Sequence, residues 1–325
     1  MSYPSDRPRR LRRTAALRAL VAETRLHPSD LVQPLFVREG IEEPRPIPSM
    51  PGQVQHTRES LRKAAAAAAQ AGVGGIMLFG VPAAKHADGR GAWDPEGIAQ
   101  LALADVAAEV GEATVVIGDI NLDEYTDHGH VGLLGPDGDV DNDATLRAYS
   151  RVAVAQAAAG ATIVAPSGMM DGQVAAIRAG LDAAGYQRVP ILAYAAKYDS
   201  AFYGPFRTAV ESSLVGTRST HQQDPANLRE SMREVELDVE EGADLVMVKP
   251  AGLYLDVVRR VADAVDVPVA AYQVSGEYAA LEAAAGHGWL QRERAIEESL
   301  TAIRRAGARI VLTYWATEVA QRLHR

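Results

Sequence analysis

The sequence predicts an α/β protein: a closed (β/α)8 (TIM) barrel with an N-terminal extended arm. Three observations support this fold. Apolar runs alternate with helical stretches, glycine follows many of the helical stretches, and several apolar runs end on a polar residue. Eight such units in about 290 residues suit a closed barrel better than a doubly wound sheet, which rarely needs eight parallel strands.

The predicted strands are short apolar runs without in/out alternation, as expected for strands that are buried on both faces of a parallel sheet. They cover residues 32–37, 75–79, 114–119, 162–165, 190–194, 244–249, 268–274 and 309–315. The predicted helices cover residues 57–71, 95–110, 144–159, 172–184, 226–241, 254–265, 293–306 and 317–323. Glycine in a left-handed conformation commonly ends a helix, and the glycines in this position are Gly72, Gly160, Gly185, Gly242 and Gly307.

Residues 1–28 have a different composition from the rest of the chain. They contain Pro4, Pro8 and a cluster of arginines at positions 7, 9, 10, 12 and 13. Such a segment cannot bury a core of its own, so we expect an arm that contacts a neighbouring subunit. Residues 29–325 then form one catalytic barrel domain.

Composition excludes several classes of function. With 325 residues, 47% of them hydrophobic, the chain can bury a large core. The net charge of −9 and the lack of an extended basic patch argue against nucleic-acid binding. No apolar run approaches the roughly 18 to 20 residues that span a membrane, and no signal peptide is evident, so we expect a cytoplasmic protein. Zero cysteines exclude disulfides, a thiolate nucleophile and thiolate metal ligands.

Two apolar runs end on a lysine. Residues 243–249 lead to Lys249, which Pro250 follows, and residues 189–196 lead to Lys197. If both amines face one apolar cavity, burial and mutual repulsion lower their pKa values. A lysine with a lowered pKa can attack a ketone and form a Schiff base. The alternative is that each lysine extends from its strand into water.

The other strand ends are also polar. In a barrel the carboxyl ends of the strands converge on one pocket, which would be ringed by Asp119, Ser167, Lys197, Lys249, the segment 272–275 and Tyr314. The segment of about 200–225 is too long for an ordinary barrel loop, so we expect a lid. Its Arg207 and Arg218 suit a carboxylate substrate, although a solvated loop with surface arginines is the alternative.

Several motifs occur in a recognisable order. They are DINLDEYTDHGH from Asp119, VDND from Val140, APSGMMDG from Ala165, AKY from Ala196, YGPFR from Tyr203, EGADLVMVKP from Glu241, VSGEY from Val274 and LTY from Leu312. From about Arg9 to the C-terminus the chain resembles the porphobilinogen synthase (5-aminolaevulinate dehydratase) family. The resemblance implies a barrel with an N-terminal arm and a hydro-lyase of tetrapyrrole (haem) biosynthesis. Such an enzyme condenses two 5-aminolaevulinate molecules to porphobilinogen with loss of two waters.

The resemblance also implies roles for individual residues. Lys249 matches the Schiff-base lysine for the substrate that supplies the propionate side of the product, and Lys197 matches the lysine for the acetate-side substrate. The remaining matches are Ser275 and Tyr314 for the propionate-side carboxylate, Arg207, Arg218 and Gln222 for the other carboxylate, Asp119 and Ser167 near the amino end of the first-bound substrate, and Phe202 and Tyr203 for the pocket wall and lid. Tyr272, at the end of its strand, is expected to be a substrate-binding residue.

Other positions depart from the family pattern. Many members place a three-cysteine zinc site where this chain has Asn121, Asp123 and Val131. We therefore expect no catalytic zinc and no cofactor required for the chemistry. The nearby His128-Gly-His130 turn is more often structural than metal-binding.

Three further departures are Gly168 for an aspartate, Thr217 for an aspartate and His221 for a tyrosine. Glu234 matches a glutamate that binds an allosteric Mg2+ in many bacterial members, and one carboxylate with several waters is a plausible magnesium site. The alternative is that Glu234 belongs to a solvated acidic helix face.

The resemblance further implies a homo-oligomer, expected to be an octamer. Two rival functions are a Schiff-base aldolase that acts on another keto acid and a catalytically silent oligomeric homologue.

Overall fold

The computed structural model describes residues 6–324, and its centre is a parallel sheet that closes into a barrel. The strand order is β6-β5-β4-β1-β10-β9-β8-β7, and a parallel bridge between Val164 and Ile191 joins the two ends of this order. The strands are β1 (Leu31–Arg38), β4 (Gly75–Val81), β5 (Val115–Ile120), β6 (Ile163–Pro166), β7 (Leu192–Lys197), β8 (Leu245–Lys249), β9 (Val269–Tyr272) and β10 (Ile310–Leu312). The predicted (β/α)8 barrel is confirmed.

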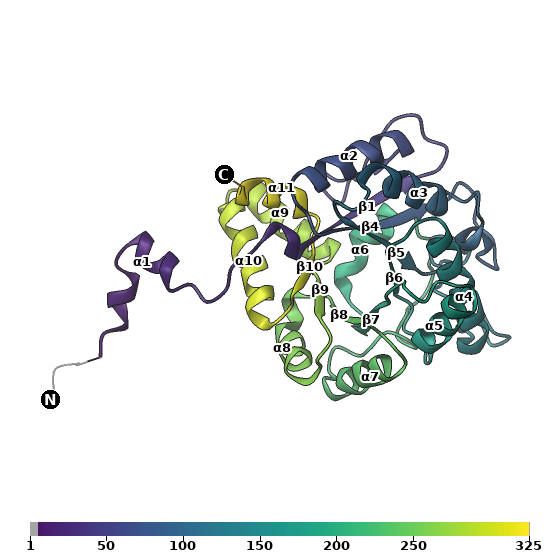
Figure 1. Cartoon of the computed structure of the whole chain (residues 1–325). Coiled ribbons are helices and arrows are strands. Elements are labelled where there is room, and N and C mark those ends of the chain that lie inside the picture. Colours follow the sequence, from purple (N-terminus) through teal and green to yellow (C-terminus); the bar gives the residue numbers. More distant parts are fainter. Residues whose placement is uncertain (1–5, 325) are drawn as a thin grey trace.

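Helices surround the strands, as Figure 1 shows. They are α2 (Arg58–Gln70), α3 (Ile98–Val110), α4 (Asn142–Ala158), α5 (Gln173–Ala183), α7 (Arg229–Glu240), α8 (Leu255–Ala264), α10 (Arg292–Ala306) and α11 (Ala316–Leu323). Each corresponds to a predicted helix. The glycines expected to end helices have positive φ angles, from 73° at Gly72 to 121° at Gly307, which is the conformation that glycine adopts without a steric penalty.

Within the barrel domain, two short strands and two α-helices were not predicted. The strands are β2 (Arg45–Pro46) and β3 (Val54–His56), which extend the sheet beside β1. The helices are α6 (Gly204–Ala209), inside the predicted lid, and α9 (Ser275–Gly286), after β9. The sequence of α9 is rich in alanine and glycine, so it lacks the apolar periodicity by which a helix is detected.

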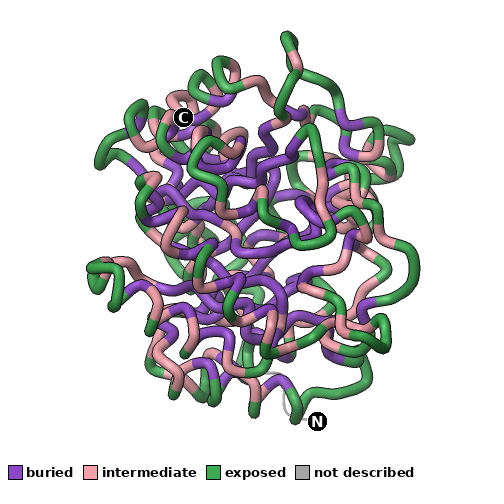
Figure 2. The backbone as a smooth tube through the Cα atoms, turned by 90° about the vertical axis from the view of Figure 1, so that its right-hand side faces the viewer, coloured by how far each residue is buried: buried purple, intermediate pink, exposed green. Residues whose placement is uncertain are grey.

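The core lies in the barrel and under the surrounding helices, where buried segments gather at the centre of Figure 2. Every residue of β4, β7 and β9 is buried. These strands show why the apolar runs lack alternation: one face packs inside the barrel and the other packs against helices. Burial on both faces holds the strand ends, and therefore the polar residues they carry, in fixed positions.

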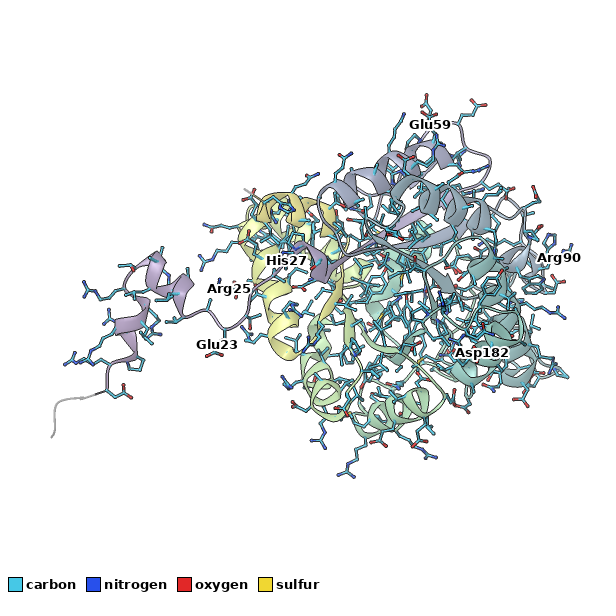
Figure 3. All side chains as sticks on the ribbon, viewed as in Figure 1. Glu23, Arg25, His27, Glu59, Arg90 and Asp182 are labelled. Atoms are coloured by element: carbon cyan, nitrogen blue, oxygen red, sulfur yellow. The ribbon has the colours of Figure 1, made fainter. Side chains whose placement is uncertain are left out.

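The N-terminal segment projects away from the barrel (Figure 1). It contains a 3-10 helix, η1 (Pro8–Arg12), and a short helix, α1 (Ala15–Leu20). Figure 3 shows Glu23 and Arg25 on the segment that joins this arm to the barrel. Residues 1–5 of the predicted arm lie outside the described residues. Across residues 6–324, no helix is both long and apolar enough to cross a membrane.

Candidate active site

The two strand-end lysines lie side by side on neighbouring strands of the barrel. Lys197 of β7 pairs in register with Lys249 of β8. The register shifts between Ala193 and Ala196, so that β7 contains one more residue than β8 over this stretch. Without this irregularity Ala196 would lie opposite Lys249, because a one-residue slip turns each side chain to the other face. The local bulge therefore places both amines on one side of the sheet.

Aromatic rings surround the amine of Lys249. Its Nζ lies 4.4 Å from the ring centre of Tyr272, 5.0 Å from that of Tyr194 and 5.3 Å from that of Phe206. The Tyr203 ring is 5.4 Å away. Only 6% of Lys249 is exposed. The rings favour a cation, but they exclude the water that would solvate it.

Burial lowers the pKa values of both lysines. For Lys249 burial and then the charge of Lys197 lower the pKa to about 7. For Lys197 burial and then the charge of Arg218 lower the pKa to about 8. An ordinary lysine has a pKa near 10.4 and is almost wholly protonated at neutral pH. Here a large fraction of the Lys249 amine is neutral at pH 7 and can act as a nucleophile.

A hydrogen-bonded group of polar side chains lies beside Lys197. The Lys197 amine donates to the carbonyl oxygen of Ser167. The Ser167 hydroxyl donates to Asp119 Oδ2 at 3.0 Å and accepts from Asn121 Nδ2 at 2.9 Å. Burial raises the pKa of Asp119 to about 6, against the opposing charges of Lys249 and Lys197. A carboxyl group with this pKa can both accept and release a proton near neutral pH.

The predicted lid covers these groups. Four of its residues, Tyr203, Phe206, Arg207 and Arg218, line a cavity of about 20 Å³ together with Phe79 of β4, both lysines, Asp119 and Ser167. That volume holds little more than one water molecule. In this structure the cavity is therefore too small to hold a keto acid.

Arg218 attaches the lid to the barrel. Its Nη2 lies 2.6 Å from Asp123 Oδ2, and the two side chains are only 7% and 1% exposed. The same nitrogen donates to the carbonyl oxygen of Gly129. Burial raises the pKa of Asp123, but Arg218, Glu124 and Lys197 together outweigh burial and lower the pKa to about 2. The pair is ionised, and breaking it would leave a buried charge without a partner.

Ser275 and Tyr314 lie on the other side of Lys249. The Ser275 hydroxyl accepts a hydrogen bond from the Phe206 backbone N–H at 2.9 Å and donates to the carbonyl oxygen of Phe202 at 3.4 Å. The hydroxyls of Tyr314 and Tyr272 are 3.1 Å apart. Ser275 is thus linked to Lys249 through Phe206, and Tyr314 is linked to Lys249 through the Tyr272 ring.

Gln222 is placed differently from the other lid residues. It is buried, and neither of its amide atoms has a hydrogen-bond partner among the described residues. It lines a neighbouring cavity of about 390 Å³, together with His221, Asp171 and Glu234. Burial lowers the pKa of His221 to about 3, so this imidazole is neutral. The structure does not bring Gln222 into the lining of the small cavity that contains the lysines.

Glu234 is half-buried in α7, and burial followed by the charges of Asp171 and Glu230 raises its pKa. Within residues 6–324 no group of three His, Asp or Glu side chains is arranged to hold a metal ion. The donor set at Glu234 therefore fits only a cation that keeps most of its water ligands, as Mg2+ does.

The three positions that match zinc ligands do not fit a zinc ion. Val131 has no donor atom and is fully buried. The Asn121 amide is bonded to Ser167 and to the backbone N–H groups of residues 122 and 123. Asp123 is paired with Arg218. The Asn121 amide and one oxygen of Asp123 are thus already bonded, although Asp123 Oδ1 has no hydrogen-bond partner among the described residues.

The structure explains the departure at Gly168. A Cβ atom at this position would lie 1.7 Å from the hydroxyl oxygen of Tyr149. That hydroxyl donates to the carbonyl oxygen of Val131 at 2.8 Å. An aspartate could not occupy position 168 unless Tyr149 moved. The missing side chain at Gly168 makes room for the Tyr149 hydroxyl, which in turn bonds to the backbone of Val131. The other departure, Thr217, is exposed on the lid.

Two residues of the site were not assigned a role from the sequence. Tyr194 lies between the lysines, with its ring centre 5.7 Å from Lys197 Nζ and 5.0 Å from Lys249 Nζ. Phe206 contacts Lys249 from the lid. Tyr194 could have been found from its position in an otherwise aliphatic strand, three residues before Lys197. Nothing in the sequence distinguishes Phe206 from its lid neighbours.

The fold and the site define a class of protein: a (β/α)8 barrel enzyme built to form a Schiff base between lysine and a carbonyl substrate. Comparison with known proteins identifies the family. Residues 5–322 match the family model for delta-aminolevulinic acid dehydratase. The chain therefore belongs to the delta-aminolevulinic acid dehydratase family.

Individual relatives agree with this assignment. The chain is 64% identical to the delta-aminolevulinic acid dehydratase of Streptomyces coelicolor over 324 residues, which cover 99% of this chain and 98% of the relative. It is 65% identical to the enzyme of that name from Mycobacterium tuberculosis over 321 residues, 98% of each chain. A solved structure of porphobilinogen synthase from Toxoplasma gondii in complex with its product porphobilinogen superposes with a TM-score of 0.95. That protein is 42% identical, and the match covers 98% of this chain and 91% of that one.

Proposed function

We propose that this chain is a lyase that condenses two 5-aminolaevulinate molecules to porphobilinogen with loss of two waters, in tetrapyrrole biosynthesis. The observation that carries this proposal is the pair of buried lysines in register on β7 and β8. A reaction that joins two keto acids needs two carbonyl-activating groups within reach of each other. Holding both substrates side by side also removes much of the entropic barrier to their reaction.

Lys249 and Lys197 each act on one substrate. The neutral amine attacks the ketone carbon, and the resulting carbinolamine loses water to give a protonated imine. This imine withdraws electrons and acidifies the adjacent C–H bond, which prepares the substrate for carbon–carbon bond formation. We assign Lys249 to the propionate-side substrate, as its match to the family motif implies, and the Tyr272 ring 4.4 Å from its amine, whose hydroxyl is 3.1 Å from that of Tyr314, supports this. Lys197 serves the acetate-side substrate.

Asp119 and Ser167 supply the proton transfers beside Lys197. The Asp119 carboxyl, with its pKa of about 6, can take the proton that leaves the attacking amine and return it to the departing water. The Ser167 hydroxyl, which donates to Asp119 Oδ2 at 3.0 Å, orients that carboxyl.

Two groups of residues hold the substrate carboxylates. Ser275 and Tyr314, with Tyr272 beside them, bind the carboxylate of the propionate-side substrate through their hydroxyl groups. Arg207, Arg218 and Gln222 bind the other carboxylate. Both arginines line the cavity that contains the lysines. Gln222 has an unpartnered amide but lines the neighbouring cavity, so its contact with the carboxylate requires the segment to move when substrate binds. Phe202 and Tyr203, at the start of the lid, shield the imines from water.

The lid, residues of about 200–225, opens to admit substrate and closes for the reaction. The cavity of about 20 Å³ in the closed state supports this motion, since it cannot admit a substrate molecule. The barrel of residues 29–325 forms the catalytic domain and residues 1–28 form an arm.

The chemistry proceeds without zinc, because Val131 offers no donor atom and the charge of Asp123 is already paired with Arg218. A strong zinc chelator should leave activity unchanged, and a stoichiometric zinc whose removal abolishes activity would contradict this.

We assign Glu234 to a regulatory Mg2+, because its half-buried carboxylate lies among other acids. The test is to titrate Mg2+ into EDTA-treated wild type and Glu234→Ala. A response in wild type alone supports the site, and equal responses refute it.

The protein acts in the cytoplasm as a homo-oligomer, expected to be an octamer. The arm supports assembly: it projects from the barrel and exposes Leu11, Leu20 and Val21, which are 52%, 76% and 43% accessible in the single chain. Exposed apolar side chains on a projecting segment are typical of a contact with another subunit.

One assay separates this function from its rivals. Wild type incubated with 5-aminolaevulinate should form a pyrrole, and Lys249→Ala should form none while retaining its fold by circular dichroism. An aldolase that acts on another keto acid would form no pyrrole but would give a borohydride-trapped imine on Lys249 with its own keto acid. A silent homologue would do neither.

A further inference from the structure

Glu277 links two loops that carry active-site residues. Its Oε1 accepts a hydrogen bond from the backbone N–H of Gly252 at 2.6 Å, and its Oε2 accepts one from Val274 at 2.7 Å. The backbone N–H of Ala251 also donates to this carboxylate. Ala251 and Gly252 follow Lys249 closely, and Val274 directly precedes Ser275. One side chain therefore joins the end of β8 to the start of α9.

The start of α9 also contacts the lid. The Ser275 hydroxyl is hydrogen-bonded to Phe206 N and Phe202 O. A Cβ atom at Gly276 would lie 2.5 Å from the carbonyl oxygen of Phe202, so the two backbones are in close contact. A shift of this turn would move Ser275 relative to Lys249 and disturb the closed lid.

The carboxylate of Glu277 accepts hydrogen bonds only from backbone N–H groups among the described residues. Burial raises its pKa to about 7, and its hydrogen bonds to three backbone N–H groups oppose that rise. A partly buried carboxylate that accepts three backbone hydrogen bonds holds those groups in fixed relative positions, because charge-assisted hydrogen bonds are the stronger kind.

We propose that Glu277 is a positioning residue that fixes the spacing between the Lys249 amine and the Ser275 hydroxyl, and thereby selects γ-keto acids. The inference rests on the proposed function, in which Lys249 bonds to the ketone and Ser275 binds the carboxylate of the same substrate molecule. In a γ-keto acid two methylene groups separate these functional groups. A fixed spacing therefore rejects homologues with one methylene more.

The test compares imine formation with two keto acids. Wild type, Glu277→Gln, Glu277→Asp and Asp244→Asn are incubated with 4-oxopentanoate or with the longer 5-oxohexanoate. Cyanoborohydride traps each imine, and mass spectrometry quantifies the adduct on Lys249. Asp244 is the matched control, because its carboxylate also accepts a backbone hydrogen bond, from Ile191 at 2.8 Å, but at the opposite end of β8.

Wild type and Asp244→Asn should prefer 4-oxopentanoate by about tenfold or more, the selectivity expected for one methylene group. Glu277→Gln places an NH2 group against a backbone N–H, and Glu277→Asp is too short to reach both loops, so both should lose most of the preference. Unchanged preference in both variants, or equal loss of trapping for the two acids, would overturn the proposal. Pyrrole formation by wild type from 5-aminolaevulinate tests the proposed function separately, so its absence alongside a Glu277-dependent preference would count against that function alone.

Discussion

Replacement of Lys197 by methionine tests whether one lysine activates the other. The positive charge of Lys197 lowers the pKa of Lys249, second only to burial. Methionine has a similar length and removes that charge, so the pKa of Lys249 should rise by ~1 unit. At pH 7 the neutral fraction of Lys249 would fall from about one half to about one tenth, and the rate of imine formation would fall about fivefold.

The assay is cyanoborohydride trapping of 4-oxopentanoate on Lys249 from pH 6 to pH 10. The midpoint of the pH profile should lie near 7 in wild type and about one unit higher in Lys197→Met, with equal rates above pH 9. Lys63→Met is the control, since Lys63 is an exposed residue that pairs with Glu59 on α2. An unchanged midpoint in Lys197→Met would refute the argument that repulsion between the lysines activates Lys249.

Three further predictions concern stability and assembly. Lys249→Met should be more stable than wild type by a few kcal/mol at pH 7, because the folded pKa of about 7 lies below the unfolded value. This difference should shrink as the pH rises from 7 towards 10.5, and urea denaturation at several pH values will measure it; a pH-independent difference would contradict the reasoning. Asp123→Asn should lose ~3 to 5 kcal/mol, because Arg218 is left as a buried charge, and Asp123→Asn/Arg218→Gln should recover part of the loss. Additive losses in that double-mutant cycle would show that the pair is not coupled. Removal of residues 1–28 should reduce both the assembly size, by light scattering, and the activity, whereas an arm-less protein of unchanged size and activity would show that the arm has no such role.

The barrel was predictable because its strands are buried on both faces. A strand such as β7, in which every residue is buried, must be apolar throughout. A lysine at its end then stands out in the sequence. The helices of the barrel were equally evident, apart from α9, whose many small residues give no apolar periodicity. The elements that position the site could therefore be read from local patterns.

Other features of the site depend on contacts between distant segments. The register shift between Ala193 and Ala196 aligns the two lysines, yet it leaves no trace in the sequence. The Arg218–Asp123 ion pair joins residues 95 positions apart. The fit of Gly168 against Tyr149 likewise depends on the packing of α4 beside β6. Local sequence patterns cannot predict such contacts, because they form between segments that are distant in the chain.

Lys249 should bond covalently to the substrate. Borohydride reduction of the wild-type enzyme in the presence of 5-aminolaevulinate, followed by peptide mapping, measures this bond directly. We expect a reduced adduct on Lys249, with a second adduct on Lys197 at high substrate concentration. An adduct on an unrelated lysine, with full activity in Lys249→Ala, would contradict this expectation.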